Sequence, residues 1–134
     1  MADNMLLKKL LVKPGNRVLV LNPPPGWLEG GLGPLPERVE VTGQAGGGGF
    51  DVVHLFVRDG GELRRFALEA VAALRPGGIL WVSYPKRSSK VDTDLTRDRG
   101  WDRLDAAGWQ TVTQVSVDAT WSALRFRPKA EVGR

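Results

Sequence analysis

Short apolar runs alternate along the chain with segments of helical periodicity. Three of these runs are β-branched, apolar and bounded by turn residues, a pattern typical of strands buried on both faces of a parallel sheet. They are residues 17–22, 50–57 and 79–84. Residues 38–42 alternate polar and apolar side chains, which predicts a half-exposed strand at a sheet edge. Residues 111–117 and 120–127 flank Asp118-Ala119 and predict an antiparallel hairpin.

Helices are predicted on either side of the strand at 79–84. Asp59 is a good N-cap, and Glu62 three residues later makes a pair that resembles a capping box. The apolar residues that follow recur in steps of three and four and form one face. They are Leu63, Phe66, Ala67, Ala70, Val71 and Leu74. The turn Arg75-Pro76-Gly77-Gly78 ends this helix, and a second, short helix is predicted over 98–107, with Gly108 as its C-cap.

Strands joined by helices call for a parallel, doubly wound sheet. The sequence therefore predicts an α/β fold: a minimal Rossmann-like, mostly parallel sheet of about six strands that ends in an antiparallel hairpin. A length of 134 residues suits one domain. We expect this domain to span residues 1–127, with residues 43–49 as a glycine-rich loop and 128–134 as a frayed, disordered tail.

Composition excludes several kinds of chemistry. With no cysteine and one histidine, the chain cannot form disulfides, use a thiolate nucleophile or bind a metal through cysteine or paired histidines. No apolar run is long enough to span a membrane and no secretory signal is evident, which predicts a protein without membrane partners. The net charge is +4, but basic residues are mixed with acidic ones and are not interleaved with aromatics, so nucleic-acid binding is disfavoured.

The middle of the chain resembles a known family. The segment Phe50-Asp51-Val52-Val53, a following helix, and Arg75-Pro76-Gly77-Gly78 before the next strand resemble the second half of class I S-adenosylmethionine-dependent methyltransferases. Ala107-Gly108-Trp109 is similar to the turn before the final hairpin of that family. The resemblance implies a strand order of 2-1-3-4-6-5, with strands numbered as they occur here.

The whole chain also resembles a group of small uncharacterised bacterial proteins that share a domain of unknown function. Their pattern includes a Lys-Pro-Gly turn, a glycine–tryptophan pair after the first strand and a Pro-Lys loop after the central strand, and this chain has all three. The resemblance implies a bacterial, cytoplasmic setting. It implies no activity.

The turn after the first strand departs from the methyltransferase pattern. Such a turn needs glycines, so that backbone N–H groups at a helix N-terminus can approach the ligand. Here it reads Asn22-Pro23-Pro24-Pro25-Gly26, and prolines have no N–H to donate. The carboxylate expected after the second strand is missing too, because the chain there reads Thr42-Gly43-Gln44. The sequence therefore predicts no cofactor, with S-adenosylmethionine as the alternative.

Two other sets of polar residues have simpler interpretations than a site. Asp92, Asp94 and Asp98 carry the oxygen ligands that divalent cations prefer, but they match no loop pattern, so we expect solvated acids. His54 lies mid-strand among apolar residues and is interpreted as a core histidine rather than a catalytic base. No catalytic or metal-binding residue is predicted.

Ligands of open α/β sheets bind outside the carboxyl ends of the strands. Residues gathered there form the candidate site, and the basic ones among them could form a donor-rich lip for an anion or an acidic peptide. The candidate residues are Asn22, Pro23, Pro24, Pro25, Gly26, Trp27, Arg58, Tyr84, Lys86, Arg87, Ser88 and Lys90.

Three functions follow from these observations. The first is a non-catalytic binding or interaction module, whose partner is an unknown protein or a small anionic ligand; a homodimer through an exposed sheet edge or a tryptophan surface is a further expectation. The alternatives are a methyltransferase with an atypical cofactor loop and a nucleic-acid accessory protein.

Overall fold

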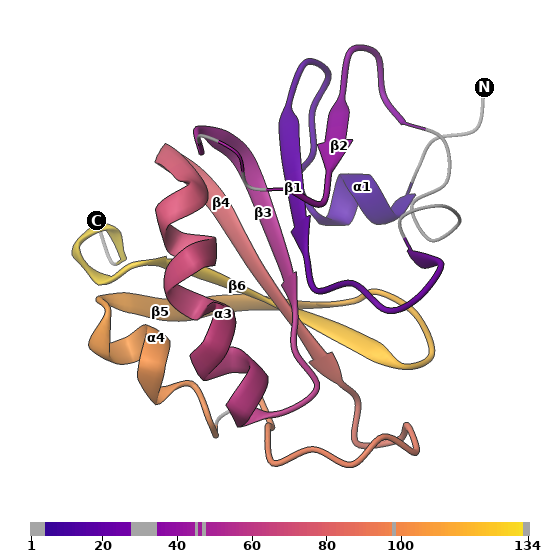
Figure 1. The fold of residues 1–134 in the computed structure, drawn as a ribbon, viewed down its shortest axis with the longest axis vertical. Coiled ribbons are helices and arrows are strands. Elements are labelled where there is room, and N and C mark those ends of the chain that lie inside the picture. The colour runs from indigo at the N-terminus through magenta and orange to yellow at the C-terminus, as the bar shows by residue number, and fades with distance from the viewer. Residues whose placement is uncertain (1–4, 28–34, 45, 47, 98, 133–134) are drawn as a thin grey trace.

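The computed structural model contains one mixed sheet flanked by helices (Figure 1) and describes residues 5–27, 35–44, 46, 48–97 and 99–132. The strands are β1 (Arg17–Leu21), β2 (Glu40–Thr42), β3 (Phe50–Phe56), β4 (Leu74–Pro85), β5 (Trp109–Ser116) and β6 (Trp121–Pro128). The helices are α1 (Met5–Lys9), α3 (Gly60–Ala73), α4 (Asp102–Ala106) and the 3-10 helix η1 (Lys129–Glu131).

The order of the six strands is β2-β1-β3-β4-β6-β5, as predicted. Strands β2, β1, β3 and β4 pair in parallel, whereas β6 runs antiparallel to both β4 and β5. The carboxyl ends of β1, β3 and β4 therefore lie at the same edge of the sheet, and the loops that follow them are neighbours there.

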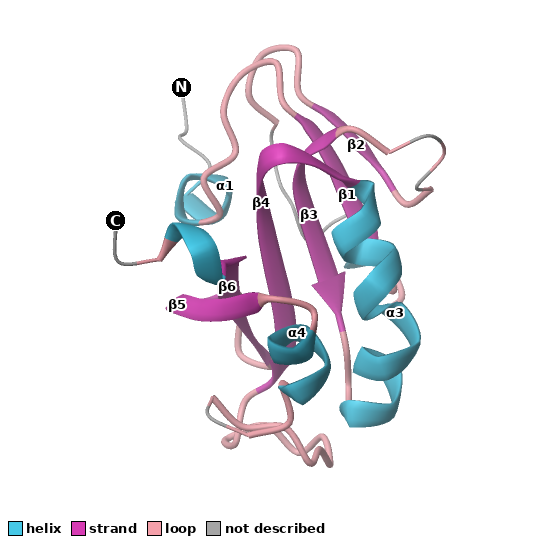
Figure 2. Ribbon diagram, turned by 90° about the vertical axis from the view of Figure 1, so that its left-hand side faces the viewer, coloured by secondary structure: helices cyan, strands magenta, loops and turns pink. Residues whose placement is uncertain are grey.

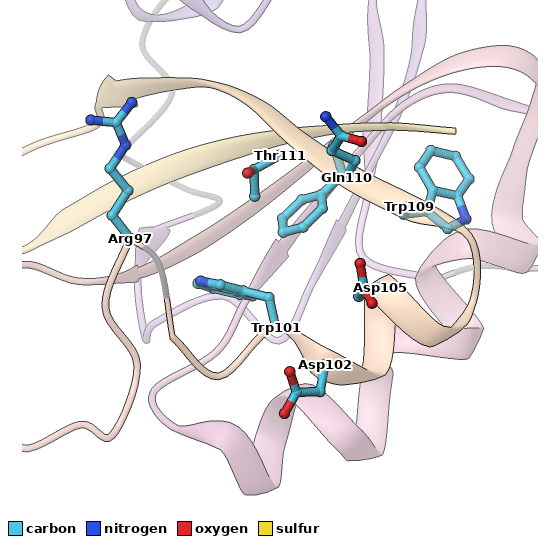
Figure 3. A pocket seen from close by; sticks show the side chains of 8 residues that line it. Arg97, Trp101, Asp102, Asp105, Trp109, Gln110 and Thr111 are labelled. Carbon is cyan, nitrogen blue, oxygen red and sulfur yellow. The ribbon is translucent and has the colours of Figure 1, made fainter. Parts of the chain in front are cut away.

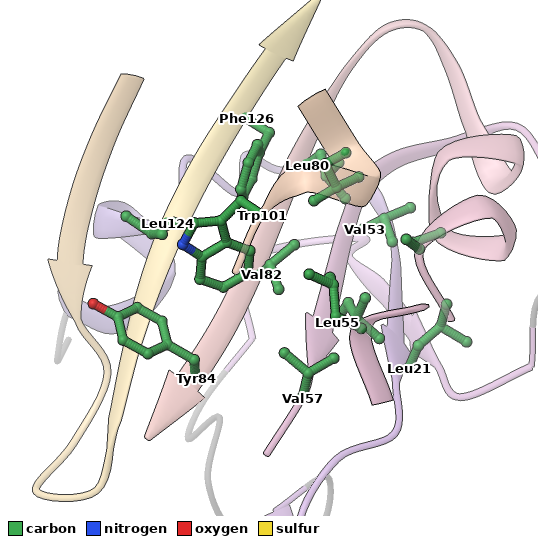
Figure 4. Close-up of a cluster of buried hydrophobic side chains, with 14 of the residues drawn as sticks. Leu21, Val53, Leu55, Val57, Leu80, Val82, Tyr84, Trp101, Leu124 and Phe126 are labelled. Atoms are coloured by element: carbon green, nitrogen blue, oxygen red, sulfur yellow. The ribbon is translucent and has the colours of Figure 1, made fainter. Parts of the chain in front are cut away.

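Helices cover both faces of this sheet. Figure 2 shows α3 and α4 on one face and α1 on the other. Beneath α3 and α4 lies one core cluster, in which Val53, Leu55 and Leu80 are fully buried and Trp101 packs between β6 and α4 (Figure 4). A second cluster, on the α1 face, contains Trp81 and five other buried aromatic or leucine side chains: Leu7, Leu10, Trp27, Phe56 and Trp121.

Helix α1 was not predicted from the sequence. It has only five residues and ends in Lys8 and Lys9, and a helix this short is not stable without tertiary contacts. Those contacts exist here: Leu7 and Leu10 are buried on the sheet, and the indole Nε1 of Trp81 donates a 2.9 Å hydrogen bond to the carbonyl of Leu10.

Helix α3 begins as the sequence predicts. The side chain of Asp59 accepts a 2.9 Å hydrogen bond from the backbone N–H of Glu62, which satisfies one of the first-turn donors that no intrahelical carbonyl reaches. Glu62 does not complete the capping box with Asp59, because its carboxylate accepts the N–H of Arg58 instead, at 2.7 Å.

The structure differs from the sequence predictions at three further places. The predicted turn at 75–78 forms part of β4, because Leu74 pairs with Phe50 across a register irregularity. The short helix covers only Asp102–Ala106 rather than 98–107. Where a frayed tail was predicted, Pro128 ends β6 and η1 follows, with the N–H of Lys129 donating to the carbonyl of Gly108 at 2.8 Å; residues 133–134 lie outside the described residues.

Candidate functional site

The side chains of Asn22, Arg58 and Glu62 form a hydrogen-bonded group at the carboxyl ends of β1 and β3, here called the β1-end cluster. The amide Nδ2 of Asn22 donates to the carbonyl of Phe56 at 2.9 Å and to Glu62 Oε1 at 3.2 Å. Arg58 donates from Nε to both carboxylate oxygens of Glu62 and from NH2 to Oε2, the shortest contact being 2.8 Å. The polar groups at the end of β1 thus bond one another.

Charge reinforces this cluster. The hydrogen bonds and positive charge of Arg58 lower the pKa of Glu62, against the opposing effect of its partial burial. The Glu62 side chain is 19% exposed and that of Arg58 is 67% exposed, so the ion pair lies at the rim of the sheet. Asn22 itself is left-handed, with φ at +54°, a conformation that asparagine tolerates better than most residues.

The proline turn after β1 brings Trp27 back onto the sheet. The carbonyl of Pro24 accepts the N–H of Trp27 at 3.1 Å, and Gly26 takes a positive φ of +77°. The Trp27 ring is buried on the α1 face, where its centroid lies 4.7 Å from that of Phe56 and 5.4 Å from that of His54. Trp27, a candidate ligand contact in the sequence, is here a core side chain.

His54 occupies the centre of this aromatic group. Its Nε2 lies 2.5 Å from the hydroxyl of Ser83 on β4, and its ring stacks on Phe56 at 4.3 Å. Burial lowers the pKa of His54 to about 3, so its imidazole is neutral across the physiological range. The interpretation as a satisfied core histidine is confirmed.

Residues 86–90, here called the basic loop, follow β4. The loop is fastened to the hairpin: the backbone N–H of Lys86 donates to the carbonyl of Thr120 at 2.7 Å, and its Nζ donates to Ser116 Oγ at 2.6 Å. Arg87, Ser88 and Lys90 are exposed. A hollow of about 340 Å³ lies within the loop and the residues after it, lined on its basic side by Lys86, Arg87, Ser89 and Lys90.

The segment after the basic loop is held to the body of the protein at two points. The carboxylate of Asp94 accepts the N–H of Gly60, the first residue of α3, at 2.8 Å, and Leu95 is buried in the core beneath α3. Since Asp94 bonds this backbone donor, it serves as a second cap of α3. Among the described residues, no three acidic or histidine side chains gather as a metal site would require; Asp98 lies outside that part of the chain.

The twelve residues predicted for the site therefore separate into groups. Asn22 and Arg58 meet through Glu62, a residue that the sequence assigned only to the helix cap. Tyr84 turns away from this edge: its ring packs on Trp101 with centroids 5.5 Å apart, and its hydroxyl lies 3.2 Å from Gln114 Oε1. Lys86, Arg87, Ser88 and Lys90 belong to the basic loop, and residues 23–27 form the turn that brings Trp27 into the core.

A second hollow, of about 250 Å³, opens between α4 and β5 (Figure 3). Its wall includes the rings of Trp101 and Trp109 and the carboxylates of Asp102 and Asp105. Asp105 is already paired with Lys129 at 2.8 Å, and the indole Nε1 of Trp101 donates to the carbonyl of Thr96 at 2.7 Å. Sequence reasoning missed this hollow because it depends on how α4 packs beside β5 and on the hairpin register that places Phe126 across from Thr111.

Solved structures share this architecture. The chain superposes on a ribosomal protein L11 methylase from Lactobacillus delbrueckii subsp. bulgaricus with a TM-score of 0.60 at 12% identity, covering 93% of this chain and 76% of that one. It is also similar to fibrillarin from Aeropyrum pernix with natively bound S-adenosyl-L-methionine (TM-score 0.57, 18% identity, 86% and 67% covered). A third is the DhpI–SAH complex (TM-score 0.52, 18% identity, 84% and 76% covered).

The chain therefore has the fold of class I S-adenosylmethionine-dependent methyltransferases, as the resemblance of residues 50–109 implied. At these identities the similarity defines the fold alone. Neither protein-family models nor curated proteins gave a match to the sequence, so the resemblance to small bacterial proteins stays a prediction. Within the described part of the chain, no helix is both long enough and apolar enough to cross a membrane.

Proposed function

We propose that this chain is a non-catalytic binding module built on a methyltransferase-like sheet. The observation that carries the proposal is the β1-end cluster. A cofactor seated at the end of β1 needs backbone N–H donors and open polar groups. Here prolines 23–25 have no N–H, and the Asn22 amide is bonded to the carbonyl of Phe56 and to Glu62.

The second cofactor contact is replaced as well. At the end of β2, where a carboxylate would meet the ribose, Thr42 uses its hydroxyl to accept the N–H of Gln44 at 3.2 Å. These residues do not fit an adenosyl group, and we derive no methyl transfer from them. Isothermal titration calorimetry with S-adenosylmethionine and with S-adenosylhomocysteine is expected to give no binding heat. Micromolar binding of either compound would overturn the proposal.

The basic loop is the surface that we propose meets the partner. Arg87 and Lys90 are exposed and make no ion pair with any described residue, while Lys86 fixes the loop to the hairpin. A set of cations held on an anchored loop suits an acidic segment of a protein or a small anion. Asp92 also lines the hollow, and its negative charge restricts the acidic ligand to the basic side.

Fluorescence polarisation with a labelled acidic peptide tests this surface. The double variant Arg87→Ala, Lys90→Ala is expected to weaken binding by about tenfold, which corresponds to about 1.4 kcal/mol. The matched control is Lys9→Ala, Lys13→Ala, which removes the same charge from exposed positions elsewhere. If both double variants weaken peptide binding equally, the peptide responds to net charge alone, and the basic loop is not the partner surface.

An active methyltransferase is the second candidate function. The observation in its favour is the similarity of fold to proteins with bound S-adenosylmethionine or its product. The calorimetric titration separates it from the binding module. The nucleic-acid alternative, the homodimer and the cytoplasmic location stay predictions; a gel shift at low salt that weakens steeply as salt rises would support the first of these.

A further inference from the structure

Two arginines lie on the same face of β6, on the side of the sheet covered by α1. Leu124 and Phe126 belong to the core beneath α3 and α4, whereas Ala123 belongs to the core on the α1 face. Because side chains alternate along a strand, Arg125 and Arg127 share the α1 face. Figure 2 shows α1 on that face of the sheet, opposite α3 and α4.

Arg125 carries one unsatisfied donor and no described ion-pair partner. Its Nε is buried and has no hydrogen-bond partner, and no described carboxylate lies within ion-pair distance of its guanidinium. A buried donor without an acceptor costs free energy, and more so when the group is charged. Burial lowers the pKa of Arg125, and the positive charge of the neighbouring Arg127 lowers it further.

Three residues surround Arg125 on this face: Thr113, Trp81 and Arg127. The strand register places Thr113 on β5 directly across from Arg125, and Thr113 is exposed on the same face. Trp81 flanks Arg125 on the other side, in register on β4, and is fixed by its bond to Leu10. Arg127 is 41% exposed and faces Glu131 at 3.8 Å, a distance and exposure typical of a weak surface pair.

We propose that Arg125 and Arg127, with the hydroxyl of Thr113, form a binding site for a divalent oxyanion of the phosphate type. Guanidinium groups match the oxygen spacing of phosphate, and two of them balance its two negative charges. The ligand supplies the negative charge that no described carboxylate gives Arg125 and relieves the repulsion between the two cations. The site lies across the sheet from α3 and apart from the basic loop, so it stands independently of the proposed function.

The arginine Nε–Hε signals in ¹H–¹⁵N NMR spectra report on this site directly. The protein is titrated with sodium phosphate and, separately, with phenyl phosphate, while sodium chloride keeps the ionic strength constant. We expect saturable shifts of the Arg125 and Arg127 signals in the phosphate titration. Saturation by phenyl phosphate as well assigns the site to phosphomonoesters; saturation by phosphate alone assigns it to the inorganic ion.

Variants decide whether the arginines act as a pair. Arg127→Gln changes a partly exposed residue and is expected to weaken phosphate binding about tenfold while leaving the fold intact; Arg125→Lys keeps the charge but loses the forked donors and is expected to weaken it as well. Arg65→Gln, on the exposed side of α3, removes one charge as the matched control. Linear, unsaturable shifts, or equal effects of Arg127→Gln and Arg65→Gln, would overturn the proposal.

Discussion

The buried imidazole of His54 makes the stability of this fold depend on pH in a way that can be calculated. An unfolded chain binds a proton at His54 with a pKa near 6.5, whereas burial lowers the pKa in the folded protein to about 3. Between these values unfolding takes up one proton, so acid favours the unfolded state. The stability contributed by the neutral histidine is complete above pH 6.5 and is lost as the pH falls through this window.

The magnitude follows from the width of the window. Each pH unit below 6.5 removes about 1.4 kcal/mol from the free energy of unfolding, so acidification from pH 6.5 to 5 costs about 2 kcal/mol. This range lies above the pKa of most carboxylates, and Asp51 and Glu62 titrate lower still because arginine and backbone hydrogen bonds lower their pKa values. The loss over this range is therefore assigned to the histidine.

Urea unfolding at a series of pH values measures this loss. His54→Gln, which keeps a hydrogen-bonding side chain beside Ser83 but does not titrate, should flatten the dependence between pH 6.5 and 5. Because the chain has a single histidine, its NMR signal also gives the folded pKa without assignment, even if the variant does not fold. A folded pKa near 6.5, or equal stability at both pH values, would refute the reasoning.

Three substitutions test other contacts by urea unfolding. Glu62→Gln removes the anionic acceptor at the end of β1 and should lower the free energy of unfolding by about 1–2 kcal/mol. The control Glu69→Gln, on the exposed side of α3, should leave it almost unchanged. Equal losses for the two variants would show that the β1-end cluster does not stabilise the fold. Trp27→Ala should cost about 3 kcal/mol because the ring is buried; a loss below about 1 kcal/mol would mean a surface side chain. Asp94→Ala should cost about 1 kcal/mol through the lost cap, and Asp92→Ala, its exposed neighbour, should not match it.

The central fold was predictable because its signals are local. The apolar run from Phe50 and the Asp59 cap specify β3 and the start of α3 within a few residues of sequence, and both have their expected form. The segment 75–78 has the composition of a turn, yet β4 begins at Leu74 because that residue pairs with Phe50. Pairing between distant strands overrides local preference there.

The candidate site was harder to predict because its residues meet only through tertiary contacts. The sequence placed Asn22 and Arg58 at one edge of the sheet, which was correct, but the link between them is Glu62, whose carboxylate could equally have capped the helix. Trp27 follows a glycine and three prolines, so nothing local indicates that its ring returns to the sheet. Arg125 lies in an ordinary alternating strand, and only the packed structure shows its unsatisfied Nε.

The most direct test of the account is a ¹H–¹⁵N NMR titration of the uniformly labelled protein with S-adenosylmethionine. Prolines 23–25 have no N–H, and the side-chain amide of Asn22 is already bonded to Phe56 and Glu62, so these residues offer an adenosyl group no hydrogen-bond donor at the end of β1. The backbone amides of Asn22, Gly26, Trp27 and Gln44 are therefore expected to keep their positions up to saturating nucleoside. Saturable shifts that cluster on these four signals would contradict the central claim.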